Sequence, residues 1–165
     1  MECIASSIDD EVSSVNQSIP VPDADSLEGA RQRRLTLKQA ISAVEVAASS
    51  PAADPNWRAI NLRELGRLRE AFDEHVAEVE ADDGLLRDLV RDAPRLQNRI
   101  SQVEAEHPTI CAEIDATIAL AEDPAVDSDE LRTAVMSTLM SIVRHRQAGS
   151  DLVYNAYQVD IGISG

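Results

Sequence analysis

Two stretches of the chain carry mostly apolar side chains at intervals that alternate between four and three residues, over 96–121 and 131–156. This alternation is typical of helices that pack along a neighbouring helix through one continuous seam. Two such seams favour helix-on-helix packing over any sheet. The seam positions are Leu96, Ile100, Val103, His107, Ile110, Ile114, Thr117 and Ala121 in the first stretch, and Leu131, Val135, Thr138, Ile142, His145, Gly149, Leu152 and Ala156 in the second.

Two further amphipathic segments precede these seams. The first is expected at residues 36–49, with Thr36 and Gln39 as a capping box at its start. The second is expected to start at Asp54, with Pro55 in its first helical position. Its predicted buried face consists of Trp57, Ile60, Leu65, Leu68, Phe72, Val76 and Val79.

The remaining helix boundaries also have sequence signals. A short helix is expected at 85–91, after which Asp92 caps a new start. Asp127 opens an acidic first turn of the last helix, expected at 129–158. We therefore predict an all-α fold, an up-down-up-down four-helix bundle over residues 35–162.

The first 34 residues are predicted to be a disordered acidic tail. Residues 1–30 hold seven acidic side chains and no basic one, and they show no helical or strand periodicity. Such a segment cannot bury enough apolar surface to offset the loss of chain entropy on folding.

The overall charge restricts the partners that the chain can have. The net charge of −15 disfavours binding to nucleic acid and to anionic membranes, and it favours a protein partner with a basic surface. No signal peptide and no apolar run of membrane-spanning length is visible. The two cysteines, Cys3 and Cys111, do not suggest a disulfide framework. We therefore expect a cytoplasmic protein.

The three histidines of the chain, His75, His107 and His145, fall one each on the second, third and fourth predicted long helices. Two of them occupy seam positions, and the rise of 1.5 Å per residue places these two at similar depth in antiparallel neighbours. Three interpretations are open: neutral core histidines that hydrogen-bond to one another, a metal site, or a pH-sensing or ligand pocket.

Four short motifs contain or follow the histidines: FDEH at 72–75, GLL at 84–86, VEAEH at 103–107 and VRHR at 143–146. In these motifs the chain resembles the hemerythrin-like (HHE cation-binding) family, over residues 35–162. The resemblance implies a four-helix bundle whose core holds a non-haem diiron centre, bound by histidines and two carboxylates.

The sequence departs from that family where its ligands would be. Ligand pairs in such bundles stand four residues apart on one helix, because these positions share a face. Carboxylates on the same helix faces as the histidines are limited to Glu78 and Glu104, so a diiron centre is expected to be lost. The residues four positions after His75, His107 and His145 are Val79, Cys111 and Gly149, respectively.

Two hypotheses for function follow. The first is a non-enzymatic interaction or regulatory module on a hemerythrin-like bundle without diiron. The alternative is a metal-binding module for iron or zinc that uses His75, His107 and His145, with Cys111 as a further sulfur ligand. No phosphate loop, nucleophile elbow or CxxC motif indicates an enzyme.

Overall fold

A computed structural model describes residues 24–158, with side-chain surroundings from Thr36 to Tyr157. The predicted tail up to residue 23, and residues 159–162 of the predicted domain, lie outside the described residues. The helices are α1 (Ala24–Ser49), α2 (Trp57–Glu80), α3 (Leu85–Asp92), a 3-10 turn η1 (Pro94–Leu96), α4 (Gln97–Glu122) and α5 (Ser128–Gln158).

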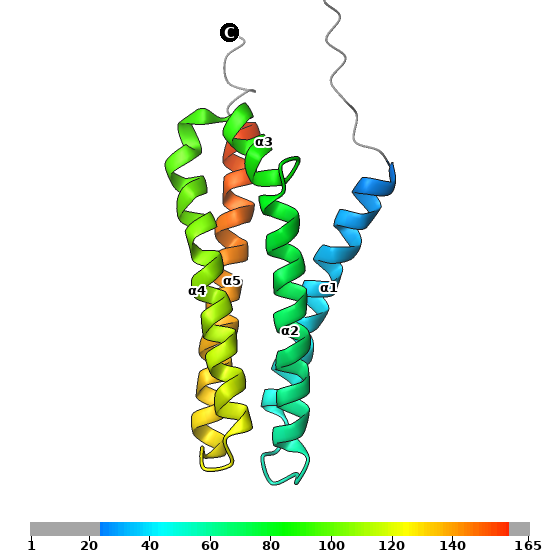
Figure 1. Cartoon of the computed structure of the whole chain (residues 1–165), viewed down its shortest axis with the longest axis vertical. Coiled ribbons are helices and arrows are strands. Elements are labelled where there is room, and N and C mark those ends of the chain that lie inside the picture. Colours follow the sequence, from blue (N-terminus) through cyan, green and yellow to red (C-terminus); the bar gives the residue numbers. More distant parts are fainter. Residues whose placement is uncertain (1–23, 159–165) are drawn as a thin grey trace, which may run out of the picture.

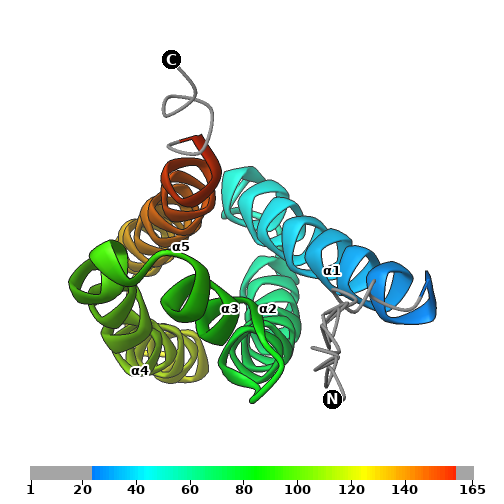
Figure 2. The same ribbon diagram turned by 90° about the horizontal axis from the view of Figure 1, so that it is seen from above.

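The four long helices form an up-down bundle, which confirms the predicted fold class (Figure 1). Each long helix packs against the next one along the chain, and α5 packs back against α1. The short helix α3 contacts α2, α4 and α5 at the upper end of the bundle, and the upper half of α1 leans away there (Figure 2). No described helix is both long and apolar enough to cross a membrane.

The predicted start of the first helix was wrong. Residues 24–34, assigned to the disordered tail, form the first turns of α1, so the helix begins at Ala24 and Thr36 lies inside it rather than at a cap. The segment contains Ala, Leu, Glu and Arg, which are strong helix formers, and has no proline. The segment holds two acidic and three basic residues, so the acidic composition of residues 1–30 does not extend through it, and helix propensity was the better guide.

The second helix also begins later than predicted. Asp54 lies in the connecting turn, where its Oδ1 accepts a hydrogen bond of 2.8 Å from the backbone N of Asn56, and α2 begins at Trp57. An aspartate that binds the backbone N–H two residues on forms an Asx turn, which competes with the helix cap predicted from sequence. The cap at Asp127 is confirmed, because its Oδ1 accepts from the backbone N of both Asp129 and Glu130, each at 2.8 Å.

The larger of two apolar cores fills the lower part of the bundle, nearer the α1–α2 and α4–α5 turns. All four long helices contribute to it, and Thr117 and Thr138 from facing seams share a hydrogen bond of 2.8 Å within it. We call this the lower core. Its buried members are Leu37, Ile41, Val44, Ala48, Trp57, Leu65, Leu68, Ala71, Phe72, Ile110, Ile114, Ala121, Leu131, Val135, Leu139 and Ile142.

A smaller apolar core fills the upper end, where α3 packs onto α4 and α5. Gly84 is buried in the turn before α3, and its backbone lies too close to the end of α2 for any side chain. This turn holds α3 over the bundle. We call the cluster the upper core, and its buried members are Leu86, Leu89, Ala93, Ile100, Val103, Leu152 and Ala156.

Two arginines fasten the turns at the lower end. The Arg58 guanidinium donates to the backbone oxygens of Leu120, Ala121, Asp123 and Val126, where α4 passes into α5. Arg132 on α5 donates to the oxygen of Ser50 in the other turn and lies over the Trp57 ring, 5.4 Å from its centroid. The two lower turns are thus each bound by a helix from the other half of the bundle.

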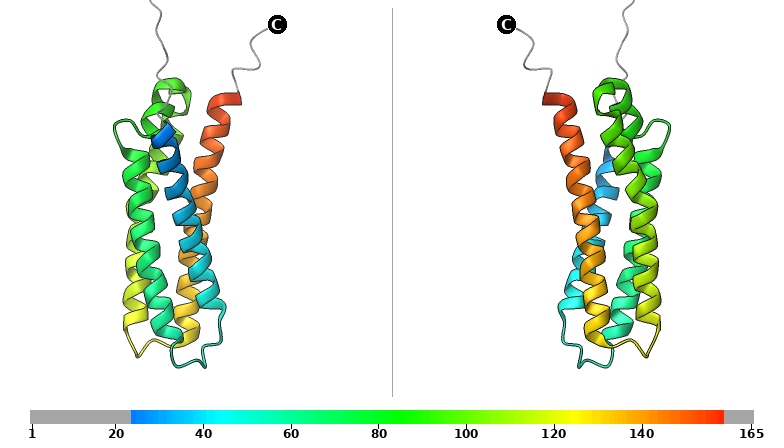
Figure 3. Two further views of the ribbon diagram at one scale, coloured as in Figure 1. Left: turned by 90° about the vertical axis from the view of Figure 1, so that its right-hand side faces the viewer. Right: turned by 90° about the vertical axis from the view of Figure 1, so that its left-hand side faces the viewer.

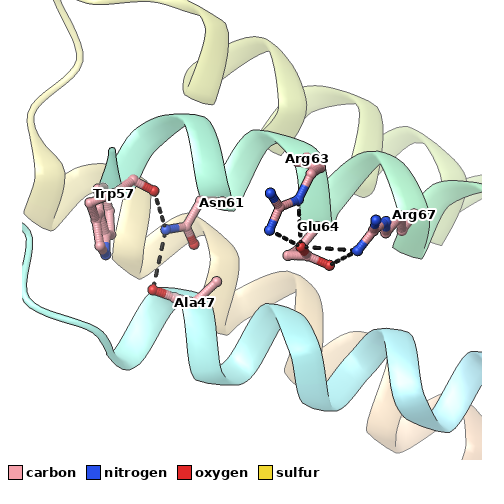
Figure 4. Close-up of polar contacts among 6 residues, drawn as sticks. All are labelled: Ala47, Trp57, Asn61, Arg63, Glu64 and Arg67. Carbon is pink, nitrogen blue, oxygen red and sulfur yellow. Dashed lines mark hydrogen bonds and ion pairs between the residues drawn. The ribbon is translucent and has the colours of Figure 1, made fainter. Parts of the chain in front are cut away.

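Two polar side chains of α2 are buried against α1 (Figure 4). The Asn61 amide donates to the oxygens of Trp57 and Ala47, which ties α2 to α1. The Glu64 carboxylate accepts from Arg63 at 2.8 Å and from Arg67, and these bonds lower the pKa of Glu64, that from Arg63 most. The Glu64 carboxylate and the Asn61 amide nitrogen are thus paired, whereas the buried Asn61 Oδ1 has no hydrogen-bond partner among the described residues.

Candidate metal centre

The three histidines converge on one point between the two cores. His75 comes from α2, His107 from α4 and His145 from α5, and one ligand atom of each lies within 4.8 Å of the other two. Along α4, His107 follows Val103 of the upper core and precedes Ile110 of the lower core. The seams of α4 and α5 therefore place the His107 and His145 rings inside the bundle, at the boundary between the two cores.

The rings contact each other and a shared aromatic neighbour. The ring centroids of His107 and His145 are 4.7 Å apart, and each lies 5.7–5.8 Å from that of His75. The Phe72 ring, one turn before His75, has its centroid 5.7–6.2 Å from all three. His107 and His145 are 2% and 3% exposed, and His75 is half-buried. Two of the three rings are therefore shielded from solvent.

Two glutamates bind the outer nitrogens of the buried rings. The Nδ1 atom of His107 lies 2.5 Å from Glu80 Oε1, and the Nδ1 atom of His145 lies 2.9 Å from Glu106 Oε2. An ionised carboxylate can only accept, so each of these nitrogens carries the proton and each Nε2 presents a lone pair. Histidines that bind metals are commonly oriented by a carboxylate in this way.

The inner nitrogens of these two rings face each other. His107 Nε2 and His145 Nε2 are 3.1 Å apart. Two lone pairs repel at this distance unless a proton or a metal ion lies between them. A metal ion bound by both Nε2 atoms would replace this repulsion with two favourable bonds.

The electrostatics of His145 favour the uncharged ring. Burial lowers the pKa of His145, and the neighbouring His107 lowers it further, while the hydrogen bond that the ring donates to Glu106 raises it. Burial prevails because charging an imidazole in the apolar interior costs more than one partly exposed carboxylate returns. Neutral imidazole is the form that binds metals.

The proposed sulfur ligand lies elsewhere. Cys111 is half-buried on α4, with its Sγ 3.9 Å from Asp73 Oδ1, and it is not part of the histidine cluster. Burial raises the pKa of the Cys111 thiol, with the nearby Arg69 opposing and the carboxylates of Asp73 and Asp115 adding to the rise. A thiol beside two carboxylates is a poor candidate for a thiolate ligand.

The carboxylates that bind the two buried rings were not predicted from the sequence, and Glu104, one of the two that were named, lies elsewhere. Glu104 is turned toward α3, where Arg87 lies 4.0 Å from it, whereas Glu106 and Glu80 bind the rings. A signal for Glu106 was present, because it directly precedes His107. Adjacent residues on a helix point about 100° apart, so Glu106 faces the neighbouring α5 and reaches His145.

A diiron centre does not fit these residues. Among the described side chains, the group of close potential ligands consists of His75, His107 and His145 and includes no carboxylate. The two glutamates bind the outer nitrogens and cannot bridge ions at the inner ones. Three neutral imidazoles fit one divalent transition ion better than two.

One surface groove borders the centre. It lies between α4 and α5, has a volume of about 370 Å³, and is lined by residues that include Glu106, Arg144 and His145. Solvent therefore reaches the carboxylate that holds His145, although the ring itself is buried.

Comparison with known proteins adds no relative. No protein-family profile matches the chain, and neither a curated protein nor a solved structure is significantly similar to it. The all-helical four-helix architecture is shown, and membership of the hemerythrin-like family stays a prediction.

Proposed function

We propose that this chain binds one divalent transition metal ion through the Nε2 atoms of His107 and His145 and a ring nitrogen of His75. The observation that carries the proposal is the facing pair of Nε2 atoms, each fixed by a carboxylate on the other side of its ring. The ion joins α2, α4 and α5 at the level between the two cores.

Zinc suits this donor set best. Imidazole nitrogens bind zinc at about 2.0–2.1 Å, which sets tetrahedral neighbours roughly 3.3 Å apart. The His107–His145 separation of 3.1 Å already matches this spacing, and His75 lies within 4.8 Å. Three imidazoles leave the fourth position of the ion to water or to another ligand.

Titration of the chelator-treated protein with Zn²⁺ tests the proposal directly. We expect one ion per chain and a higher melting temperature, with about 3 kcal/mol of stabilisation at a hundredfold excess over Kd. Binding should release protons, more of them as the pH falls, because the ion and protons compete for the same ring nitrogens. Calorimetry in buffers of different ionisation enthalpy measures that release.

Variants distinguish this site from its alternatives. His107→Gln should abolish binding, and Glu106→Gln should weaken it by about 10–100-fold, because a neutral amide oxygen orients the ring less strongly than a carboxylate. Cys111→Ser is the matched control and should leave affinity unchanged. A folded protein that binds neither Zn²⁺ nor Co²⁺ would overturn the proposal, as would two irons per chain with an oxo-bridge absorption band.

The hypothesis of an interaction module is compatible with this proposal. A metal that links three helices is a structural element, and a partner would then bind elsewhere on the molecule.

A further inference from the structure

The outer face of α5 carries a second heptad pattern. Exposed side chains recur at alternating intervals of three and four residues along the side opposite the buried seam. In the right-hand view of Figure 3, α5 runs along the outside of the bundle with no helix in front of it. We call these residues the outer stripe: Met136, Met140, Val143, Gln147, Ser150, Tyr154 and Tyr157.

The outer stripe contains most of the exposed large hydrophobic side chains of the described residues. Seven large hydrophobic side chains are exposed among the described residues, and five belong to the stripe, with exposed fractions of 45–61%. The other two, Val46 and Leu85, lie apart on α1 and α3. Exposed apolar side chains gathered on one side of a helix are typical of an interaction surface.

The charge of α5 indicates which partner this surface fits. α5 carries three acidic and three basic residues, whereas the whole chain has 30 acidic and 15 basic residues. Two copies that meet through α4, with five acidic residues and one basic residue, would bring acidic surfaces together. Two copies that meet through α5 bring together helices of balanced charge. The charge of α1 is also close to balanced, with three acidic and four basic residues, but among its described side chains only Val46 is an exposed large hydrophobic.

We propose that two copies of this chain pair through antiparallel α5 helices at the outer stripe. This inference does not depend on the metal site. In an antiparallel heptad register, Met140 of one copy packs on Tyr157 of the other, Val143 on Tyr154, and Gln147 on Ser150. Methionine and tyrosine suit each other, because sulfur contacts aromatic rings favourably.

The flanking charges select that register. It places Arg144 of each copy beside Asp151 of the other, so two opposite-charge pairs form about the twofold axis. Shifting the helices by one heptad instead pairs Arg144 with Arg144 of the other copy, and likewise Arg146 with Arg146. The repulsion in the shifted arrangement disfavours it.

Sedimentation equilibrium of the full chain, from about 1 to 100 µM, tests the pairing. We expect a mass approaching twice the 17.9 kDa of the chain. The double variant Met140→Glu/Val143→Glu should raise the dimer Kd at least about tenfold while circular dichroism stays unchanged, because both side chains are solvent-exposed. Val46→Glu, an exposed apolar residue outside the stripe, is the matched control and should leave Kd unchanged.

A charge exchange tests the register. Arg144→Asp and Asp151→Arg should each weaken the dimer, and their combination should restore it. A monomer at all concentrations overturns the proposal, including a monomer that binds lipid vesicles through α5. A dimer insensitive to Met140→Glu/Val143→Glu overturns it equally, because the copies then meet elsewhere. Failure of the combined charge exchange to restore pairing overturns the register.

Discussion

The lower and upper cores are built from different elements, although α4 and α5 run through both. In the lower core four long helices surround the apolar side chains, and the turns are bound by arginines. In the upper core α1 leans away and the eight-residue α3 takes its place. The histidines lie where this exchange occurs, because a polar layer is tolerated where one apolar packing arrangement gives way to another.

The seams of α4 and α5 are continuous along both helices, although the side chains that pack against them differ between the lower core, the histidine layer and the upper core. His107 and His145 occupy the same kind of seam position as Ile110 and Ile142, yet their neighbours include glutamates that reach in from the boundary. The seam pattern explains why the two rings are buried, whereas their position between the cores explains why glutamates can reach them.

The largest expected loss of stability comes from making a cavity in the lower core, which four long helices enclose. Leu68→Ala should lower the free energy of unfolding by about 4 kcal/mol, because four fixed helices cannot close the resulting cavity. The matched change in the upper core, Leu89→Ala, should cost only about 2 kcal/mol, because the short α3 can move inward. Urea denaturation measures both. Equal costs would show that the two cores are equally rigid.

The next effect tests how α3 is held. Gly84→Ala should lower the free energy of unfolding by about 2–3 kcal/mol, because added methyl volume meets fixed atoms. A Cβ there would lie 2.6 Å from the backbone oxygen of Glu78 and 2.7 Å from that of Val79. Thermal denaturation measures the loss, and amide exchange should show that α3 loses protection before α1. A neutral result would mean that α3 is not fixed by this turn.

A smaller effect tests the layer between the cores. Burial holds the pKa of His145 below its usual value of 6.5, so the unfolded chain takes up this proton first as the pH falls. Stability of the metal-free protein is therefore present above pH 6.5 and is lost below it, by at most about 1.4 kcal/mol per pH unit.

Urea denaturation between pH values of about 7.5 and 5 measures this slope. His145→Gln should flatten it, because the variant has no titrating ring at that position. Leu68→Ala is the control, since it should lower stability equally at every pH. A slope that persists in His145→Gln would assign the pH dependence to another group.

The smallest effect is a gain. Gly149→Ala should raise the free energy of unfolding by about 0.5–1 kcal/mol, because glycine in a helix interior costs backbone entropy. A Cβ at Gly149 meets nothing within 4 Å, and the same is true at Gly66 of α2, which serves as the parallel variant. Thermal denaturation should show both gains. A lower melting temperature for Gly149→Ala, but not for the variant at Gly66, would indicate that the open space at Gly149 is required for stability.

Much of the fold could be predicted from the sequence, because seam patterns report burial directly. Every predicted seam residue of α4 after Leu96 is buried, and on α5 only Gly149 is less than fully buried. Helix starts were harder to predict, because a side chain such as Asp54 can serve equally as a helix cap or as part of a turn.

The candidate site was predicted in part. The seams gave two of the three imidazoles, and His75 followed from its place beside Phe72. The carboxylates could not be assigned, because Glu80 stands in the last turn of α2 and its direction depends on the turn that follows. Cys111 was included on helical spacing from His107, but its side chain lies near Asp73 on α2.

The arginines at the lower turns have a consequence for how the molecule opens. Arg58 of the α1–α2 hairpin binds the turn of the α4–α5 hairpin, and Arg132 of the α4–α5 hairpin binds the turn of the α1–α2 hairpin. The two hairpins therefore cannot separate at the lower end without breaking both sets of hydrogen bonds. We therefore expect transient opening to begin at the α3 end of the bundle. Amides of α4 and α5 should exchange faster the farther they lie from the lower turns, and a bound ion should leave through the upper end.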